Sequence, residues 1–488
     1  YDEALWTGNI YPHLKEEVQP FLKKKMIMGY FVDNEQKWED DRVFDFYLSL
    51  PAKSPGSQRF IDYLRRSFDN DIAKLNAALG TQAYSFETLP GSKAKKAYSP
   101  DLHRDLLRPW RSATAAYFYR RYVAELRRLD PDHLVLGVRW AGFPDMDLYT
   151  AVSPIMDVDS INDYNRYATL RPDYWKAYKL TGKPMIISEW SFSGYKTPGH
   201  KSLQFIEVYT QKNRGIGYTK TIREMARTPF LIGSHWFLWD DYDKGWVANN
   251  GNYWPDENMG LVSTDEKTVY TELGEACKKA NAEIPALHAN SIGWKPSSLP
   301  TAAPRALAAF SPKVDGDLSD WPASLKLKMG MAQQLVPGLK ANGGDYYLGA
   351  NAASLSVGAF IPDTSLQETG ADWSWQSDNI AVRIAPLDGL HPEDESSHVQ
   401  IHPTGGGAAK DQPYVYEWAG NSPNQVVQAE AVRKPAPGGF ILEARLPAAI
   451  LKSYPGSADR KWKISVMYED IDGISETWWE GVLSLPNR

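Results

Sequence analysis

The segment "MIMGYFVDNEQKW", residues 26–38, decides the fold of the first half of the chain. An apolar run with β-forming side chains, residues 26–32, passes directly into Asp33, Asn34 and Glu35. A short apolar run bounded by polar residues predicts a buried strand. Polar groups at the end of such a strand are costly to desolvate unless they have partners or a task. We therefore predict a candidate site where this strand ends.

The same strand-then-helix pattern repeats from about residue 15 to residue 290. Strands that alternate with helices indicate a parallel sheet covered by helices. The strands are apolar throughout, which is typical of a sheet with both faces buried. Further strands are predicted at 133–140, 155–164, 183–190 and 230–239. Helices are predicted at 60–80, 112–131 and 171–182, and another is predicted to begin within 202–216.

Polar and aromatic residues gather at the carboxyl ends of these strands. They are Asn34, Glu35, Arg139, Trp140, Asn162, Tyr164, Glu189, Trp190 and the run from His235 to Asp241. In a (β/α)8 TIM-type barrel the carboxyl ends of the strands form the catalytic face. The sequence therefore predicts an α/β domain of this barrel type, with its site at that face.

Two glutamates stand out in this set. Glu35 and Glu189 each end an apolar strand, and two further predicted strands lie between them. A single glutamate at a strand end is more often solvated or salt-bridged than catalytic. Two of them, each flanked by aromatic and amide residues, favour glycoside hydrolysis, which needs one protonated and one ionised carboxyl group.

The chain changes character after residue 295. Residues 296–310 are rich in Pro, Ala and Ser, as is typical of a linker. Residues 311–488 contain short β-type runs separated by Gly, Pro, Asp and Asn, which predicts an antiparallel β-sandwich. These runs include "LSVGAF", "NIAVRIAP", "YVYEWAG", "FILEARLP" and "KWKISVMYED". The predicted organisation is a catalytic domain at 1–295, a linker, and an all-β domain.

Composition excludes several classes of protein. The 488-residue chain has a net charge of −6 and no basic stripe, which argues against a nucleic-acid partner. It has no apolar run of about 18 residues, so no membrane span is expected. A single cysteine excludes an intramolecular disulfide framework. The 18 Trp and 27 Tyr weakly favour a protein that stacks aromatic rings on sugars.

Two motifs resemble a known group of enzymes. "GYFVDNEQKW" and "KPMIISEWSF" are similar to the fourth- and seventh-strand motifs of the clan A retaining glycoside hydrolases. The first motif most resembles family 50, the β-agarases. The insert at 48–89 is also similar to that of the family 42 β-galactosidases. The resemblance covers roughly residues 15–285. It implies that Glu35 is the acid/base, that Glu189 is the nucleophile, and that Asn34 bonds the sugar 2-hydroxyl.

By this count the chain holds strands four to eight of the barrel. Strands one to three are then expected to be absent from it, either removed or carried by another polypeptide. The first residues do not form a signal peptide. We expect a secreted, periplasmic or outer-surface location, with the signal peptide outside the chain shown. The sequence does not indicate an oligomeric state.

The remaining candidate residues have structural alternatives. Tyr164 is predicted to hold Glu189 ionised, with Asn162 as the rival for that role. Arg139 is predicted to lower the pKa of Glu189, or else to form a structural ion pair. The predicted substrate-binding set is Asn34, Trp38, Arg139, Trp140, Asn162, Tyr164, Trp190, His235, Trp236, Trp239, Asp240 and Trp254. Core packing is the alternative for Trp236 and Trp239.

Residues 234–262 are predicted to form a cleft wall for a sugar chain, or else a self-packed loop. The acidic residues there do not have the spacing of a Ca²⁺ loop, so we predict no metal and no cofactor.

The second half resembles the family 9 carbohydrate-binding modules and their DOMON-like relatives. The resemblance rests on "SPKVDGDLSDWP", "ADWSWQSDNIAVRIAP", "GGFILEARLPAAIL" and "WKISVMYEDIDG". It implies a sugar slot between aromatic rings, with Trp373, Trp418, Trp478 and Trp479 as candidates. The alternative is a sandwich that braces the first domain and binds nothing.

The sequence therefore predicts a retaining β-glycoside hydrolase that cleaves a galactose-containing polysaccharide such as agarose or porphyran. The alternative enzyme is a β-galactosidase or another clan A β-glycanase. The alternative outside enzymes is a non-catalytic carbohydrate-binding protein.

Overall fold

The computed structural model divides into two units, Tyr1–Lys295 and Pro296–Arg488, and each is described by itself. The described residues are 1–91, 98–164, 170, 172–194, 208, 210–241, 258–264, 266–293, 305–306, 309–331, 343–364, 379–386, 397–403, 412–417, 425–451, 461–470 and 475–484.

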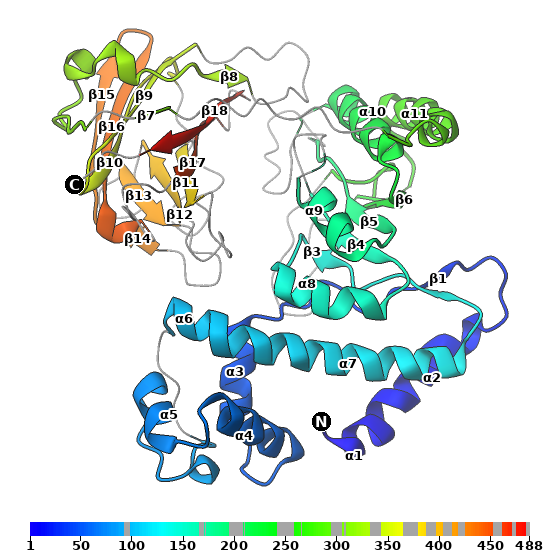
Figure 1. Cartoon of the computed structure of the whole chain (residues 1–488). Coiled ribbons are helices and arrows are strands. Elements are labelled where there is room, and N and C mark those ends of the chain that lie inside the picture. The colour runs from blue at the N-terminus through cyan, green and yellow to red at the C-terminus, as the bar shows by residue number, and fades with distance from the viewer. Residues whose placement is uncertain are drawn as a thin grey trace. The chain divides into compact units, whose positions relative to one another are not determined.

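The first unit contains parallel strands separated by helices (Figure 1). Its strands are β1 (Gly29–Tyr30), β2 (Leu134–Val135), β3 (Trp140–Ala141), β4 (Asp159–Asn162), β5 (Met185–Trp190) and β6 (Leu231–Trp236). β1 pairs with β2, and β3 to β6 form a parallel sheet in chain order. The predicted α/β class with a parallel sheet is confirmed.

The predicted strand 133–140 is interrupted, which gives two short strands in place of one. Gly137 has a φ of +95°, and a Cβ atom there would lie 2.5 Å from the hydroxyl oxygen of Ser160. Arg139 also has a left-handed backbone, with a φ of +49°. This kink turns the chain so that β2 pairs with β1 and β3 pairs with β4.

Burial differs between the middle and the edges of this arc of strands. All of β4 and nearly all of β5 is buried, as expected for a sheet covered on both faces. The same expectation is wrong for β1 and β6, where Met28 beside β1 is 51% exposed and Ile232 in β6 is 48% exposed. Within the part of the chain that the structure describes, each of these two strands has one neighbour, so its outer side is left open.

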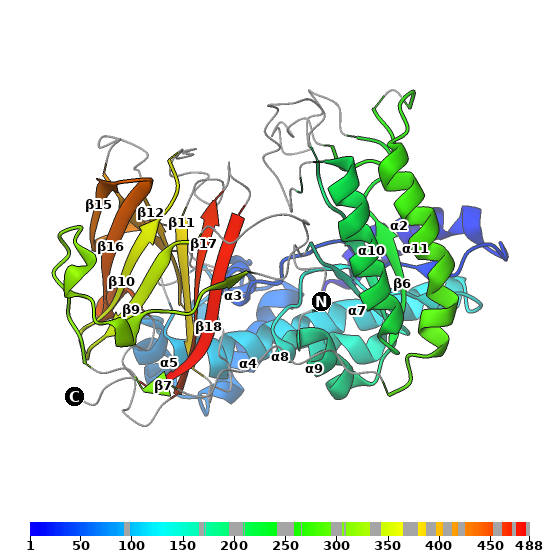
Figure 2. The same ribbon diagram turned by 90° about the horizontal axis from the view of Figure 1, so that it is seen from above.

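The helices of the first unit are α1 (Glu3–Leu5), α2 (Tyr11–Val18), α3 (Asp40–Ser49), α4 (Pro55–Ser67), α5 (Ile72–Leu79), α6 (Pro100–Leu102), α7 (Arg108–Leu129), α8 (Met146–Val152), α9 (Pro172–Thr181), α10 (Gln211–Arg227) and α11 (Thr271–Ala289). Figure 2 shows α10 and α11 packed side by side. The single helix predicted at 60–80 is wrong. Asp69 and Asn70 adopt left-handed backbone conformations and separate α4 from α5. α5 ends at Gly80, which has a φ of +64°.

The long helix α7 links an inserted helical layer to the strands (Figure 1). Residues of α3, α4 and α5 share an apolar core with the first turn of α7, where Phe44, Phe60, Leu64 and Trp110 are buried together. On its other side α7 contacts α8, which follows β3. α7 therefore lies where it can brace the connections that leave β1 and β3.

The second unit has two layers of antiparallel strands, apart from the short strand β7, which pairs parallel with β18. One sheet has the order β15-β16-β10-β9, and the other has the order β14-β13-β12-β11-β17-β18-β7, with β8 paired to β18. Its strands are β7 (Arg305–Ala306), β8 (Gly330–Met331), β9 (Asp345–Ala350), β10 (Ser354–Ile361), β11 (Asn379–Pro386), β12 (Ser397–His402), β13 (Tyr414–Glu417), β14 (Gln425–Val427), β15 (Glu430–Ala436), β16 (Gly439–Pro447), β17 (Lys461–Asp470) and β18 (Ser475–Ser484). Both sheets contribute to one apolar core, for example Val357 and Leu442 from one and Val382 and Val466 from the other. The predicted antiparallel β-sandwich is confirmed.

A buried carboxylate joins the start of this unit to its core. Glu443 of β16 is fully buried and accepts the backbone N–H groups of Asp315, Gly316 and Asp317 at 3.1, 2.5 and 3.2 Å. Its other oxygen accepts the indole N–H of Trp321 at 2.7 Å. Four hydrogen-bond donors therefore depend on the carboxylate of Glu443.

We expect the substitution Glu443→Gln to destabilise the second unit by about 2–4 kcal/mol, because an amide NH2 cannot accept a hydrogen bond and leaves buried donors unsatisfied. Urea unfolding of the whole chain, followed by circular dichroism, measures the loss. Glu430→Gln is the matched control, since Glu430 is an exposed partner of Arg445 and should change stability by less than about 1 kcal/mol. Equal losses in the two variants would contradict this account of Glu443.

Candidate active site

The side-chain amide of Asn162 brings the two glutamates together. Asn162 is the last residue of β4 and is 2% exposed. Its Nδ2 lies 2.9 Å from Glu35 Oε1, 2.9 Å from Glu189 Oε2 and 3.3 Å from Asn34 Oδ1. Its Oδ1 accepts the hydroxyl of Ser188 at 2.7 Å, which orients the amide with its nitrogen toward the carboxylates. The strand ends that the sequence analysis singled out therefore meet at one point.

Glu35 sits in a constrained backbone position after β1. Its φ is +57°, a left-handed conformation that is unusual for a residue with a Cβ atom. Its N–H donates to the carbonyl of Arg139 at 3.1 Å, which continues the contact between the β1 and β2 segments. A non-glycine residue in this region costs about 1–3 kcal/mol and persists where the surroundings over-determine it.

Glu189 of β5 is held from both of its oxygens. Tyr164 donates its hydroxyl to Oε1 at 2.5 Å, and Arg139 Nη2 donates to Oε2 at 2.5 Å. Burial raises the pKa of Glu189, while the Tyr164 hydrogen bond and the Arg139 charge oppose that rise. The pKa of Glu189 is raised overall. Arg139 lowers this pKa, as predicted, but burial has the larger effect. The ion pair itself is present.

An aromatic side chain supports the arginine. The guanidinium of Arg139 lies over the ring of Phe31, 5.4 Å from its centre, and the backbone N–H of Arg139 donates to the Ser160 hydroxyl at 2.8 Å. The His235 ring of β6 packs against Phe31 in a T-shaped arrangement, with 5.6 Å between the ring centres. Burial and then the nearby Arg139 charge lower the pKa of His235, which favours the neutral imidazole.

Three predicted tryptophans have other contacts. Trp140 and Trp190 are 5% and 3% exposed, and their rings pack against Tyr119 and Tyr218 of the covering helices. Neighbouring residues of a strand point to opposite faces, so a ring next to Arg139 or Glu189 is directed into the helix layer. The prediction that Trp140 and Trp190 contact substrate is therefore corrected to core packing. Trp38 donates its indole N–H to the Tyr119 hydroxyl at 3.1 Å.

The segment after β6 is partly described. Trp236 packs edge-on against Trp190 and donates its indole N–H to the carbonyl of Met259. Trp239 is 61% exposed, and the Asp240 backbone pairs with Val262. Trp254, Trp373 and Trp418 lie outside the described residues. For Trp478 and Trp479 the structure describes only the backbone, within β18.

Ser188 and Tyr119 were not among the predicted site residues, and no role was predicted for Asp33. Ser188 directly precedes Glu189, a position that could have drawn attention to it. Tyr119 gave no signal, because it lies in the middle of an amphipathic helix. Among the described residues, no three His, Cys, Asp or Glu side chains are grouped so that they could hold a metal ion. In the same part of the chain, no helix is long and apolar enough to cross a membrane.

Comparison with known proteins gives one curated relative. No family model matches the chain. β-Agarase B of Vibrio sp. (strain JT0107) is 28% identical over 308 residues, which cover 57% of this chain and 31% of the relative. The chain thus spans about a third of the length of the curated relative it matches. The predicted resemblance to the β-agarases is confirmed by this match.

Solved structures of two agarases and of a carbohydrate-binding module are similar to parts of this chain. An exo-β-agarase is 26% identical, with a TM-score of 0.47, over 54% of this chain and 35% of its own. Another agarase is 22% identical, with a TM-score of 0.49, over 57% of this chain and 40% of its own. A family 9 carbohydrate-binding module of Caldicellulosiruptor kristjanssonii in complex with cellotriose is 14% identical, with a TM-score of 0.26, over 38% of this chain and 93% of its own.

Proposed function

We propose that this protein is a retaining β-glycoside hydrolase that cleaves a galactose-containing polysaccharide of the agarose or porphyran type. Glu35 acts as acid/base and Glu189 as nucleophile. The observation that carries the proposal is the single Asn162 nitrogen 2.9 Å from an oxygen of each carboxylate. The β-agarase relative supports the choice of substrate class.

The spacing of the carboxylates supports retention of configuration. Glu35 Oε1 and Glu189 Oε2 both lie 2.9 Å from Asn162 Nδ2, so these two oxygens cannot be farther apart than twice that distance. Retaining glycosidases hold their carboxyl groups about 5–5.5 Å apart, whereas inverting enzymes need about 6.5–9.5 Å to admit a water molecule. Glu35 therefore protonates the leaving oxygen while Glu189 attacks the anomeric carbon. Glu35 then activates the water that releases the glycosyl-enzyme.

The neighbouring groups take defined parts in this mechanism. Asn34 bonds the sugar 2-hydroxyl, and Tyr164 and Arg139 stabilise the ionised form of Glu189. Trp38, His235, Trp236, Trp239, Asp240 and Trp254 remain our candidates for the walls of the substrate cleft. Strands β1 to β6 correspond to strands four to eight of a (β/α)8 barrel, with β2 and β3 counted together as the interrupted fifth strand. The carboxylates lie at the carboxyl face of this barrel.

The wider organisation belongs to the same proposal. Residues 1–295 form the catalytic domain, 296–310 the linker and 311–488 a carbohydrate-binding module, in a secreted, periplasmic or outer-surface protein. Agarose, porphyran and an aryl β-galactoside, each incubated with the protein and followed by reducing-end release, test the activity. Proton NMR of the first product tests retention. Cleavage of the aryl galactoside alone would favour a β-galactosidase. Sugar binding without any cleavage would favour a carbohydrate-binding protein.

Loss of the Tyr164 hydroxyl should move the pH profile in a defined direction. Its hydrogen bond lowers the pKa of Glu189, so Tyr164→Phe raises that pKa further. The nucleophile must be ionised, and a higher pKa leaves more of it protonated at acidic pH. We expect the acid limb of kcat/KM to move to higher pH, with the largest loss of activity on the acid side. A limb that stays in place or moves downward would contradict the role of Tyr164.

A further inference from the structure

The loop that carries Glu35 is tied to α7 by one buried tyrosine at both of its ends. The Tyr119 hydroxyl donates to Asp33 Oδ2 at 2.8 Å and accepts the indole N–H of Trp38 at 3.1 Å. Tyr119 is fully buried. Asp33 and Trp38 bracket Glu35, so this one hydroxyl closes residues 33–38 into a ring. Asp33 also accepts the backbone N–H of Asn34 at 2.8 Å, which fixes the residue before Glu35.

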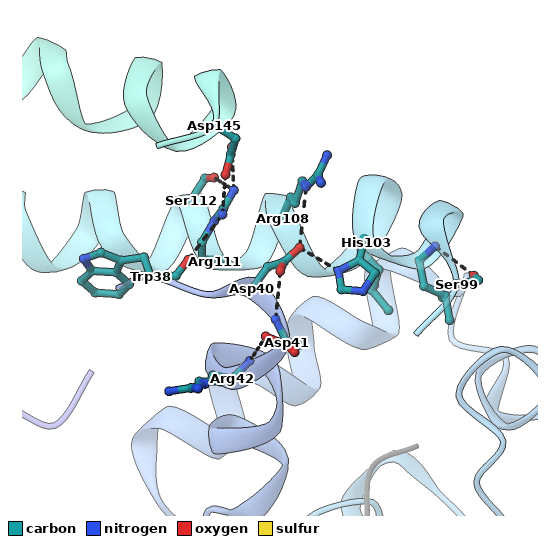
Figure 3. Close-up of polar contacts among 12 residues, drawn as sticks. Trp38, Asp40, Asp41, Arg42, Ser99, His103, Arg108, Arg111, Ser112 and Asp145 are labelled. Carbon is teal, nitrogen blue, oxygen red and sulfur yellow. Dashed lines mark hydrogen bonds and ion pairs between the residues drawn. The ribbon is translucent and has the colours of Figure 1, made fainter. Parts of the chain in front are cut away.

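A second anchor on α7, Arg111, connects Trp38 to Asp145 at the start of α8 (Figure 3). Arg111 is 4% exposed and donates through Nη1 to the carbonyl of Trp38 at 3.3 Å. The same guanidinium forms a bidentate pair with Asp145, with distances of 2.6 and 2.8 Å. Asp145 caps the start of α8 and follows β3, next to which Arg139 holds Glu189. Arg111 therefore joins the loop of one carboxylate to the connection that supports the other.

The chain after the loop is anchored to the same region. Asp40, at the start of α3, is 3% exposed and accepts His103 Nδ1 at 2.9 Å, with Arg108 Nε at 3.6 Å. Figure 3 shows Asp40 between these two side chains, beside the Arg111–Asp145 pair. The segment that bears Glu35 is thus held at Asp33 by the buried Tyr119 hydroxyl and at Asp40 by His103 and Arg108.

We propose that Tyr119 and Arg111, with Asp33 and Trp38, form a clamp on α7 that positions Glu35 for proton transfer to the leaving group. The proposal rests on the proposed hydrolase function. The left-handed backbone of Glu35 needs such support, since an isolated loop would relax from it. Proton transfer depends on alignment, and a displacement of about 1 Å can cost about a hundredfold in rate. Tyr119 and Arg111 are positioning residues, because they act on Glu35 through Asp33 and Trp38 of its loop.

The test compares leaving groups in the variant Tyr119→Phe. This change keeps the buried ring and removes the two hydrogen bonds that Tyr119 makes, to Asp33 and to Trp38. We expect kcat/KM on the polysaccharide to fall about 10- to 100-fold. The second substrate is a dinitrophenyl β-glycoside of the sugar that the wild type releases. Its dinitrophenolate leaves with little need of a proton, so formation of the glycosyl-enzyme from this substrate should slow by less than about threefold. Asp33→Asn keeps the volume of the carboxylate. It should give the same pattern as Tyr119→Phe, with a large loss of kcat/KM on the polysaccharide and a small one on the dinitrophenyl β-glycoside.

Tyr149→Phe is the matched control. Tyr149 is also fully buried and donates to an aspartate, Asp159, at 2.6 Å, but this pair lies at the opposite end of β4. Its loss should lower stability without any dependence on the leaving group. Equal losses on both substrates in Tyr119→Phe, or no loss, would overturn the clamp while the proposed function stands. A wild type that cleaves none of the polysaccharides or aryl glycosides would overturn both.

Discussion

The variant Glu189→Gln is expected to lose turnover by about 10⁴-fold or more, because an amide cannot attack the anomeric carbon. Such a loss corresponds to about 5.5 kcal/mol in the activation free energy. The side chain keeps its volume, its amide oxygen can still accept from Arg139 and Asn162, and its NH2 group can donate to the Tyr164 hydroxyl, so the strand should stay in place. Reducing-end release from agarose or porphyran measures the loss, and circular dichroism checks the fold.

Glu283→Gln is the matched control for this experiment. Glu283 of α11 is also paired with an arginine, here through two bonds to Arg223 of α10 at 2.6 and 2.8 Å. Its removal breaks a comparable ion pair away from Asn162 and should leave turnover within about twofold of the wild type. Glu189→Gln with near-normal turnover would refute the assignment of the nucleophile.

The variant Glu35→Ala should separate the two chemical steps. With the polysaccharide, turnover should fall about 10²- to 10⁴-fold, because the leaving oxygen departs without a proton. With a dinitrophenyl β-glycoside the glycosyl-enzyme still forms, but no base activates water to release it. Azide needs no general base, so it should attack the anomeric carbon, displace the Glu189 carboxylate and restore turnover. The product should be the β-glycosyl azide, in line with a double displacement.

The anomer of the azide decides between the two assignments. An α-glycosyl azide from a Glu35 variant would mean that azide entered where the nucleophile normally attacks. Glu35 would then be the nucleophile, and the roles proposed here would be reversed. The same measurement on Glu189→Ala supplies the opposite standard, since azide should there enter from the vacated face and give the α-product.

Local patterns predicted much of the architecture. The apolar runs that end in polar residues predicted β4 and β5, and the short β-type runs between turn residues predicted β10, β16 and β17, because both signals lie in neighbouring residues. The break between α4 and α5 was missed. Its cause is two consecutive left-handed residues, Asp69 and Asn70, and periodicity alone does not distinguish that turn from continuous helix.

The residues of the candidate site were likewise predicted only in part. Asn34, Glu35 and Glu189 were predicted because they end apolar strands, and their resemblance to a known motif pointed to the same residues. Trp140 and Trp190 were misplaced, because sequence position gave their strand end but not the face to which their rings point.

The sequence by itself determined that two carboxylates end parallel strands and that an all-β domain follows, since both depend on local residue patterns. Only the tertiary structure decided that Asn162 links the carboxylates and that burial outweighs Arg139 in the pKa of Glu189. It also decided that Tyr119 forms a hydrogen bond to the loop of Glu35. The physical reason is that these effects act through space. Hydrogen bonds and desolvation depend on which atoms lie within a few ångströms, and distant segments set that distance only when the chain folds.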